Sequence, residues 1–323
     1  MQQRLSSFLA FARTPRGRRL IGGASAVFGL IVLGLTVRHF ASTGWPLRDA
    51  NPKLVGIAGG FFVLAYAFKA YGWQRLFRPS ERPTPLALAA AGGAASVTGA
   101  ALPGRFDDVV RVAVVRRFPC GGVPIPTLAL SLFMLGLIDA AALMPLSAFA
   151  AATSDSSDQV RAALGVIAAG GLGAGILVAF LPRMVVSGRL LRFRLTRWLS
   201  TQVTSNREAG KATLFVLASW TVRAVGLFFL LAALGVSLSF PLALAFLCAT
   251  AASSALPISP VGGAATQAGA GAAILVASGV QLSHAVSFAI AAHGLFIVAG
   301  AAVMAVGATG AFGRRFVGSV RTA

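Results

Sequence analysis

The chain has 323 residues, of which 57% are hydrophobic and only 11% are charged, and its mean hydropathy is +0.81. A soluble globular protein needs more polar surface than this composition supplies, so an integral membrane protein is indicated. The formal net charge of +20 comes from arginines in short clusters between apolar segments, without a basic domain interleaved with aromatic residues, so anionic membrane lipid is favoured over nucleic acid as a partner.

The apolar segments are long enough to cross the membrane as helices, because about 20 residues span about 30 Å of hydrocarbon. The first could be a signal peptide, but its apolar core is longer than usual for one, and we expect a retained span. The expected spans are residues 20–37, 54–72, 126–150, 160–181, 212–234 and 283–308.

Two further apolar stretches are broken by helix-disrupting residues. Residues 85–101 are rich in Ala, Gly, Ser and Thr and end at Pro103-Gly104, and an amphipathic piece follows over residues 105–117. The second break, residues 256–263, contains two prolines and two glycines, and both breaks begin Ala-Leu-Pro. Proline and paired glycine interrupt a helix, so we interpret the breaks as the tips of two re-entrant hairpins that meet inside the membrane.

Residues 183–211 hold seven basic residues interleaved with large apolar ones. This pattern is typical of a basic amphipathic helix lying on an anionic membrane surface. A solvated loop is the alternative reading.

The distribution of basic residues decides between topologies. If residues 85–102 crossed the membrane fully, the basic segment 183–211 would lie outside and the acidic loop 153–161 inside, against the positive-inside rule. The rule is obeyed if residues 85–118 enter and leave on the cytoplasmic side and residues 241–278 on the outer side. We therefore predict a multi-pass protein of the bacterial cytoplasmic membrane with both termini in the cytoplasm.

The predicted fold is an all-α polytopic membrane protein built as an inverted repeat, a plan that many transporters share. Each half holds three transmembrane helices and one re-entrant hairpin, in residues 20–152 and 160–310, flanked by a basic N-terminus (residues 1–19) and a basic tail (residues 311–323). An offset of 154 residues carries Lys69 onto Arg223 and Asp139 onto His293. The chain is expected to form a single integral membrane domain.

Three ionisable residues fall deep in predicted spans, where a charge costs about 2.5–3.5 kcal/mol on insertion scales. We hypothesise that Asp139 and Arg223 lie near one another and line an interior cavity, and a structural staple between two helices is the alternative. His293 could relay protons, but a hydrogen bond to a carbonyl is favoured. Lys69 is expected near a cytoplasmic end, with its ammonium group snorkelling to the interface.

The two breaks carry the candidate headgroup-binding residues. Asp107 and Asp108 suit the first turn of a helix, so capping alone could explain them, whereas Arg105 and Arg111 could pair with phosphate oxygens. The helix that starts after the second break offers free backbone N–H groups and a positive dipole end. The candidate headgroup-binding set is Arg105, Arg111, Asp108, Ser259, Gly262, Gly263 and Gln267, and neighbouring hydroxyl groups could add hydrogen bonds (Ser253, Ser254 and Thr266).

Catalysis is the weaker interpretation, because no nucleophile with a base, carboxylate dyad or nucleotide-binding glycine loop is present. Cys120 and Cys248 are far apart and lack metal-ligand spacing, so neither a metal site nor a disulfide framework is indicated. We expect no cofactor. A membrane enzyme acting on lipid-linked sugar would have to rely on Asp107 and Asp108.

Residues 20–310 resemble the flippase-like membrane domain of lysylphosphatidylglycerol synthases and its stand-alone relatives. The family pattern runs Pro-Gly-Arg, a hydrophobic residue, Gly-Glu and Arg, and here reads Pro103-Gly104-Arg105-Phe106-Asp107-Asp108 and then Arg111. Pro257-Ile258-Ser259-Pro260 before a glycine pair matches a second family pattern, but Gln267 takes the place of its Glu. The resemblance implies lipid translocation or handling, and we expect no aminoacyl-transferring domain of the kind that the synthases carry.

The resulting prediction is a membrane protein that moves or presents a phospholipid or a polyprenyl-linked lipid between leaflets. Asp139, Arg223 and His293 would line the intramembrane path. The competing hypothesis is a non-catalytic accessory subunit that scaffolds a lipid-modifying enzyme or glycosyltransferase. Anionic lipid headgroups are the expected partners, with a membrane enzyme or a second copy of the chain as further candidates.

Overall fold

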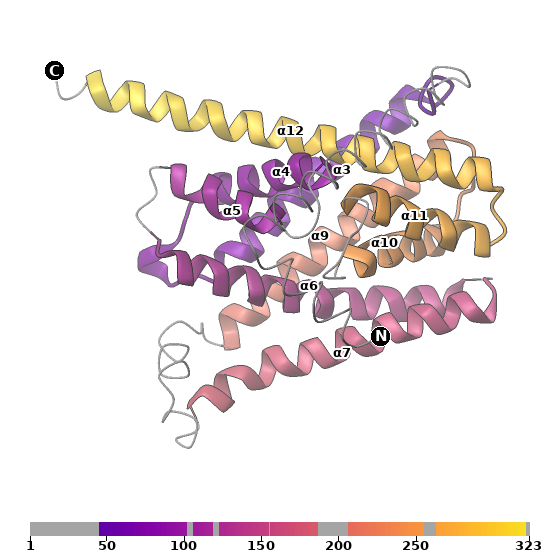
Figure 1. The fold of residues 1–323 in the computed structure, drawn as a ribbon, viewed down its shortest axis with the longest axis horizontal. Helices are drawn as coiled ribbons and strands as arrows, with labels where there is room; N and C mark the ends of the chain where they lie inside the picture. Colours follow the sequence, from indigo (N-terminus) through magenta and orange to yellow (C-terminus); the bar gives the residue numbers. More distant parts are fainter. Residues whose placement is uncertain are drawn as a thin grey trace, which may run out of the picture.

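The structure is a computed structural model that describes residues 45–101, 106–118, 123–154, 156–186, 206–254 and 263–320. The described residues form helices and connecting turns, without strands (Figure 1). The helices are α3 (Pro52–Gln74), η1 (Pro79–Glu81), α4 (Pro85–Ala101), α5 (Phe106–Arg117), α6 (Ile125–Thr153), α7 (Asp158–Val186), α9 (Asn206–Ala233), α10 (Phe240–Ser254), α11 (Gly263–Ala277) and α12 (Leu282–Val320).

Five of these helices are long and apolar enough to cross a membrane: α3, α6, α7, α9 and α12. They coincide with five of the six predicted spans, so the all-α multi-pass architecture is confirmed. The first predicted span, residues 20–37, lies outside the described residues, as does most of the basic segment 183–211. Helix α12 continues to Val320, so the helix extends beyond the candidate span, which ends at Thr309, into the predicted basic tail (residues 311–323).

Helices α3 and α9 cross in opposite directions at the centre of the molecule (Figure 1). Each carries a glycine where the partner comes closest. A Cβ atom at Gly72 would lie 2.9 Å from Val216 and 3.1 Å from the carbonyl oxygen of Ala212, and one at Gly226 would lie 2.8 Å from Phe62 and 3.2 Å from the carbonyl oxygen of Ala58. Small residues allow this backbone approach, which stabilises helix pairs in lipid.

These contacts repeat at a constant spacing in the sequence. Adding 154 to the numbers of Phe62 and Gly72 gives Val216 and Gly226, so each contact has its counterpart in the other helix. At the crossing itself, the Ser219 hydroxyl donates to the carbonyl oxygen of Ala65, 154 residues earlier, at 2.8 Å. The offset of 154 residues noted in the sequence therefore recurs in the contacts between α3 and α9.

Two pairs of short helices flank the central crossing. Helix α4 packs beside α5 and helix α10 beside α11, the first pair on the left and the second on the right of Figure 1. With 17, 12, 15 and 15 residues, each is shorter than the about 20 residues that a full crossing needs. The pairs meet where α11 begins, because a Cβ at Gly263 would lie 3.0 Å from the carbonyl oxygen of Gly99.

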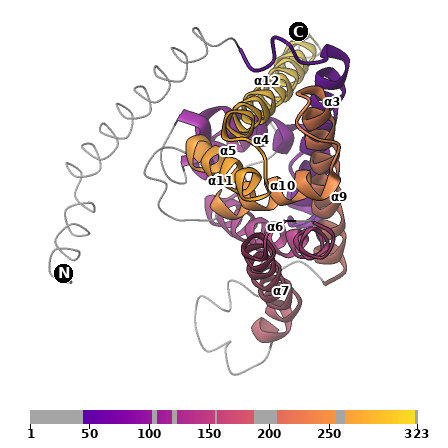
Figure 2. The same ribbon diagram turned by 90° about the vertical axis from the view of Figure 1, so that its right-hand side faces the viewer.

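The remaining long helices enclose these pairs. Helix α12 packs on α3, α4 and α11, whereas α6 contacts α9 and α10 and carries α7 on its outer side. Figure 2 shows α12 at one edge of the bundle and α7 at the opposite edge, with α10 and α11 between them. All the described helices can therefore contribute to one central region.

Contacts between connecting segments define two ends of the bundle. At one end, the backbone N–H of Asn51 donates to the carbonyl oxygen of Ala233 at 3.1 Å. The Ser156 and Ser278 hydroxyl oxygens at the same end are 3.0 Å apart. At the other end, Glu208 pairs with basic residues from two segments: Arg75 at 3.5 Å, Arg82 at 2.6 Å and Lys211 at 2.7 Å. The second end concentrates basic side chains.

Hydroxyl groups inside the apolar helices bond to their own helix. Thr213, Thr221 and Ser147 donate to carbonyl oxygens four residues earlier at 2.8–2.9 Å. Thr250 donates to the carbonyl oxygen of Leu247, three residues earlier, at 2.9 Å. A polar group that lacks a hydrogen-bond partner is costly in hydrocarbon. These local bonds to the backbone therefore allow polar residues within spans.

Candidate functional site

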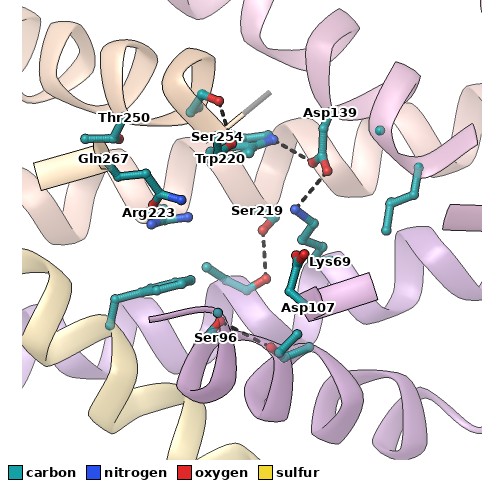
Figure 3. Close-up of a pocket in the computed structure, with 18 of the residues that line it drawn as sticks. Lys69, Ser96, Asp107, Asp139, Ser219, Trp220, Arg223, Thr250, Ser254 and Gln267 are labelled. Carbon is teal, nitrogen blue, oxygen red and sulfur yellow. Dashed lines mark hydrogen bonds and ion pairs between the residues drawn. The ribbon is translucent and has the colours of Figure 1, made fainter. Parts of the chain in front are cut away.

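A cavity of about 570 Å³ lies at the centre of the bundle and receives residues from all the described α-helices. Many of its lining residues are polar or charged, and Figure 3 shows several of them. The polar and charged lining residues are Tyr66, Lys69, Trp73, Ser96, Asp107, Asp108, Arg111, Asp139, Ser219, Trp220, Arg223, Thr250, Ser253, Ser254, Gln267 and His293.

Asp139, in the middle of α6, connects α6 to both central helices. One carboxylate oxygen pairs with the Lys69 ammonium on α3 at 2.9 Å, and the other accepts the indole N–H of Trp220 on α9 at 2.9 Å. The ammonium also lies 5.0 Å from the centre of the Trp220 ring, a cation–π distance. The three side chains therefore form one charge-neutral cluster (Figure 3).

Arg223, one turn further along α9 than Trp220, is held by aromatic rings rather than by carboxylates. Its guanidinium carbon lies 5.3 Å from the Trp220 ring centre and 3.7 Å from that of Phe296 on α12. Within the described residues it makes no hydrogen bond and no ion pair. Asp139 lies beyond ion-pair distance, although its charge still acts on the guanidinium.

Helix α5 contributes a second cluster of charges. Arg111 pairs with Asp107 at 3.3 Å and with Asp108 at 2.9 Å. Arg111 lies one turn after each carboxylate, as expected for i,i+4 and i,i+3 spacing. Both carboxylates sit in the first turn, where negative charge also complements the helix dipole.

Neutral groups complete the wall on the other side of Arg223. His293 on α12 places Nδ1 2.9 Å from the carbonyl oxygen of Ala289 and Nε2 3.3 Å from the side-chain oxygen of Gln267 on α11. Because a carbonyl oxygen only accepts, Nδ1 carries a proton. A smaller space of about 10 Å³, which both Arg223 and His293 line, is about large enough for one water molecule.

Tyr66 and Ser96 join α3 to α4. The Tyr66 hydroxyl donates to the Ser96 hydroxyl oxygen at 2.5 Å, and Ser96 donates to the carbonyl oxygen of Gly92 at 3.2 Å. The Tyr66 ring stacks on Phe296 with centres 4.9 Å apart. Phe296 thus lies against both Tyr66 and Arg223, which links α12 to the two crossing helices.

The structure brings most of the predicted site residues to one cavity. Asp139, Arg223 and His293 line it, and so do six residues of the predicted headgroup set or its neighbours: Arg111, Asp108, Gly263, Gln267, Ser253 and Ser254. The hydrogen bond of His293 to a carbonyl is confirmed. Arg105, Ser259 and Gly262 lie outside the described residues.

Two expectations need correction. Lys69 does not snorkel to the interface, because its ammonium pairs with Asp139 beside the cavity. Asp139 and Arg223 line the same cavity, but the cation that pairs with Asp139 is Lys69, and Trp220 stands between the two proposed partners. A cation four to five residues from a helix end can reach inward when a carboxylate on a neighbouring helix compensates its charge.

Sequence reasoning missed Tyr66, Ser96 and Trp220. The offset of 154 could have found them, because it carries Tyr66 onto Trp220 and Ser96 onto Thr250, all four of which line the cavity. Within the described part of the chain, no group of three or more His, Cys, Asp or Glu residues is placed to hold a metal ion.

The spans and the charged interior cavity define the class of protein: a multi-pass α-helical membrane protein. The family model of the lysylphosphatidylglycerol synthase TM region matches residues 20–305. This match covers most of the chain, so the protein belongs to that family, and the resemblance inferred from the two sequence breaks is confirmed. Searches among curated proteins and among solved structures found no match.

Proposed function

We propose that this protein moves the headgroup of a phospholipid or a polyprenyl-linked lipid between the leaflets of the cytoplasmic membrane. The observation that carries this proposal is the cavity of about 570 Å³ lined by charged residues from helices that are otherwise apolar. Ionisable groups in a span are costly and usually mark a pathway or binding site. A headgroup that enters this cavity would replace contacts with its hydration water by contacts with these polar groups. Its acyl chains would stay in the lipid.

An inverted repeat is the architecture that we propose for this task. Its support is the reciprocal packing of α3 and α9, in which Gly72 meets Val216 and Gly226 meets Phe62 at the same spacing of 154 residues. Transporters built in this way place their substrate site at the interface between the repeats. The cavity lies next to this crossing.

The pairs α4–α5 and α10–α11 would be the re-entrant hairpins of the two repeats. Their short helices support this interpretation, and so does the approach of Gly263 to Gly99. Irregular backbone at membrane depth is tolerated where it lines a polar cavity. Each hairpin would then expose its tip to the headgroup.

The end that carries Arg75, Arg82 and Lys211 would face the cytoplasm, in accordance with the positive-inside rule. Cysteine labelling of intact cells tests this orientation, after Cys120 and Cys248 are replaced by alanine. We expect Ser156→Cys to react with an impermeant reagent added outside and Arg117→Cys to react only after the cells are opened. The reverse pattern would contradict the orientation and the proposed hairpins.

Transport is tested by reconstitution into liposomes that contain a fluorescent phospholipid or polyprenyl phosphate, with a membrane-impermeant quencher outside. We expect the protein to expose lipid of both leaflets to the quencher. Gly136→Phe should slow this movement, because Gly136 lines the cavity and a Cβ atom added there meets no atom within 4 Å, which leaves room for a larger side chain to narrow the cavity.

Gly173→Phe is the matched control, because Gly173 is exposed on α7, does not line the cavity and also has no atom within 4 Å of an added Cβ. It should transport as the unaltered protein does. Folded protein that moves no lipid of the panel would contradict the proposal. Co-purification of a glycosyltransferase at equal stoichiometry, together with that result, would favour the accessory-subunit hypothesis.

A further inference from the structure

We infer that Arg223 is the anion-binding residue of the cavity and that it takes one phosphate group of a lipid headgroup. The inference rests on the proposed lipid-handling function and assigns the chemistry that the site recognises. The ligand is a phosphate ester, whether it is part of a lipid or of a soluble compound.

The surroundings of Arg223 leave its hydrogen-bonding groups unused. The Trp220 and Phe296 rings lie against the guanidinium, with centres 5.3 Å and 3.7 Å from its carbon, and no carboxylate among the described residues pairs with it. Its planar fork of five N–H donors matches two phosphate oxygens at once. Aromatic rings also exclude water, which strengthens any charge-assisted bond formed there.

The other cations that line the cavity are already engaged. Lys69 pairs with Asp139 at 2.9 Å, and Arg111 pairs with Asp107 and with Asp108. A phosphate group that bound either cation would have to compete with a carboxylate. At Arg223 it would meet no competing carboxylate among the described residues.

The relation between the halves sharpens this difference. The offset that carries Lys69 onto Arg223 carries Asp139 onto His293. Where the first half supplies a carboxylate that neutralises its cation, the second half supplies a ring whose nitrogens contact Ala289 and Gln267. His293 brings no negative charge to Arg223, so the position that corresponds to Asp139 does not neutralise the Arg223 guanidinium.

The test measures binding of soluble probes to the purified full-length protein by titration calorimetry. The probes are dihexanoyl phosphatidylglycerol, dihexanoylglycerol, which has no phosphate, and glycerol 1-phosphate. We expect dihexanoyl phosphatidylglycerol to bind and dihexanoylglycerol not to bind. Tighter binding of the lipid than of glycerol 1-phosphate supports a lipid source of the phosphate, and the opposite order supports a soluble phosphate ester.

Arg223→Gln should weaken phosphate binding about tenfold to a hundredfold, the range for losing hydrogen bonds to a charged group. The Arg223→Lys protein should bind phosphate with intermediate affinity, because lysine keeps the positive charge but lacks the planar guanidinium that donates two parallel hydrogen bonds. Arg117→Gln, on the exposed end of α5, is the control that removes a cation away from the cavity. Unchanged affinity of a folded Arg223→Gln protein overturns the inference.

His293→Asp tests the relation between the halves directly. The new carboxylate should pair with Arg223, as Asp139 pairs with Lys69, and weaken phosphate binding by a similar factor. The double variant Arg223→Gln/His293→Asp should bind no worse than Arg223→Gln alone, and additive losses would contradict the pairing. Melting temperature and gel filtration show whether each variant is folded.

The outcomes separate this inference from the proposed function. Phosphate binding that depends on Arg223, without lipid movement in liposomes, contradicts transport and supports the anion site. Lipid movement with phosphate binding that is insensitive to Arg223 supports transport and overturns the anion site.

Discussion

The first and second halves of the chain bring related residues to the cavity but treat their charges differently. In the first half, Lys69 pairs with a carboxylate on a neighbouring helix, and Arg111 pairs with two carboxylates on its own helix. In the second half, Arg223 packs between aromatic rings, and helices α10 and α11 contain no charged residue. Positions 154 residues apart therefore differ in the chemistry that surrounds their cations.

This difference suggests a division of roles. An ion pair in a partly dry interior roughly offsets the desolvation of its two charges, so its net contribution to stability is small while both partners are present. The pair of Lys69 and Asp139 links α3 to α6, and Trp220 extends the link to α9. The first half would use its charges to hold helices together, whereas the second half keeps one charge available for a ligand.

The largest effect is expected from removing one member of this pair. Asp139→Leu should lower the free energy of unfolding by about 3 kcal/mol, because the Lys69 ammonium then lacks a partner. The double variant Lys69→Met/Asp139→Leu should recover most of that loss. Arg223→Met breaks no ion pair and should change the stability by less than about 1 kcal/mol. Denaturant unfolding in detergent micelles measures all three.

Equal losses in the single and the double variant would show that the two charges are not coupled. A loss in Arg223→Met as large as that in Asp139→Leu would remove the proposed contrast between the halves, because Arg223 would then be a structural residue like Lys69.

The packing of α3 and α9 should be symmetric even though the chemistry is not. Gly72→Ala and Gly226→Ala should each cost about 1–3 kcal/mol of stability, because the added methyl group meets the partner backbone and side chain. Gly56 and Gly210, also 154 residues apart, have no atom within 4 Å of an added Cβ. Alanine there should be neutral or stabilise by up to about 1 kcal/mol through helix propensity.

Thermal unfolding in micelles compares the four glycine variants. A large cost at only one of Gly72 and Gly226 would contradict a reciprocal crossing, and an equal cost at Gly56 and Gly210 would show that the effect is not one of packing.

Trp220 and its counterpart Tyr66 offer a smaller and more local comparison. Trp220→Phe removes a hydrogen bond to the Asp139 carboxylate and should cost about 1.5 kcal/mol, the lower range for bonds to charged groups, because Asp139 keeps Lys69. Tyr66→Phe removes a neutral bond to Ser96 and should cost about 1 kcal/mol or less. In a protein that already carries Asp139→Asn, Trp220→Phe should cost no more than Tyr66→Phe does. A double-mutant cycle of Trp220→Phe and Asp139→Asn measures this.

The sequence predicted the helices well because their limits depend on local signals. The small-residue segment 85–101 forms α4, and the helix expected after the second break is α11 (Gly263–Ala277). Proline, glycine and the length of apolar runs act within a few residues, so no knowledge of the fold is needed to locate them.

The pairing of side chains was harder to predict. Lys69 lies near the end of its apolar run, and hydropathy along the chain favoured snorkelling. Its true partner depends on where α6 crosses α3, which the sequence does not encode locally. The aromatic environment of Arg223 could not be predicted locally for the same reason, because Phe296 lies on another helix, 73 positions later in the chain.

The smallest effect is expected where both partners are neutral. Gln267→Ala removes the contact with His293, but His293 keeps its bond to the carbonyl oxygen of Ala289, so the cost should be about 0.5–1 kcal/mol. Gln281→Ala, at an exposed position before α12, is the control and should have no effect beyond about 0.5 kcal/mol. Denaturant titration in micelles measures this difference when the unfolding curves of both variants are fitted with one common m-value, the slope of the free energy of unfolding against denaturant concentration. A cost above about 2 kcal/mol would mean that Gln267 compensates a charge, as Asp139 does in the first half. The second half would then hold no open cation, and the contrast between the halves would fail.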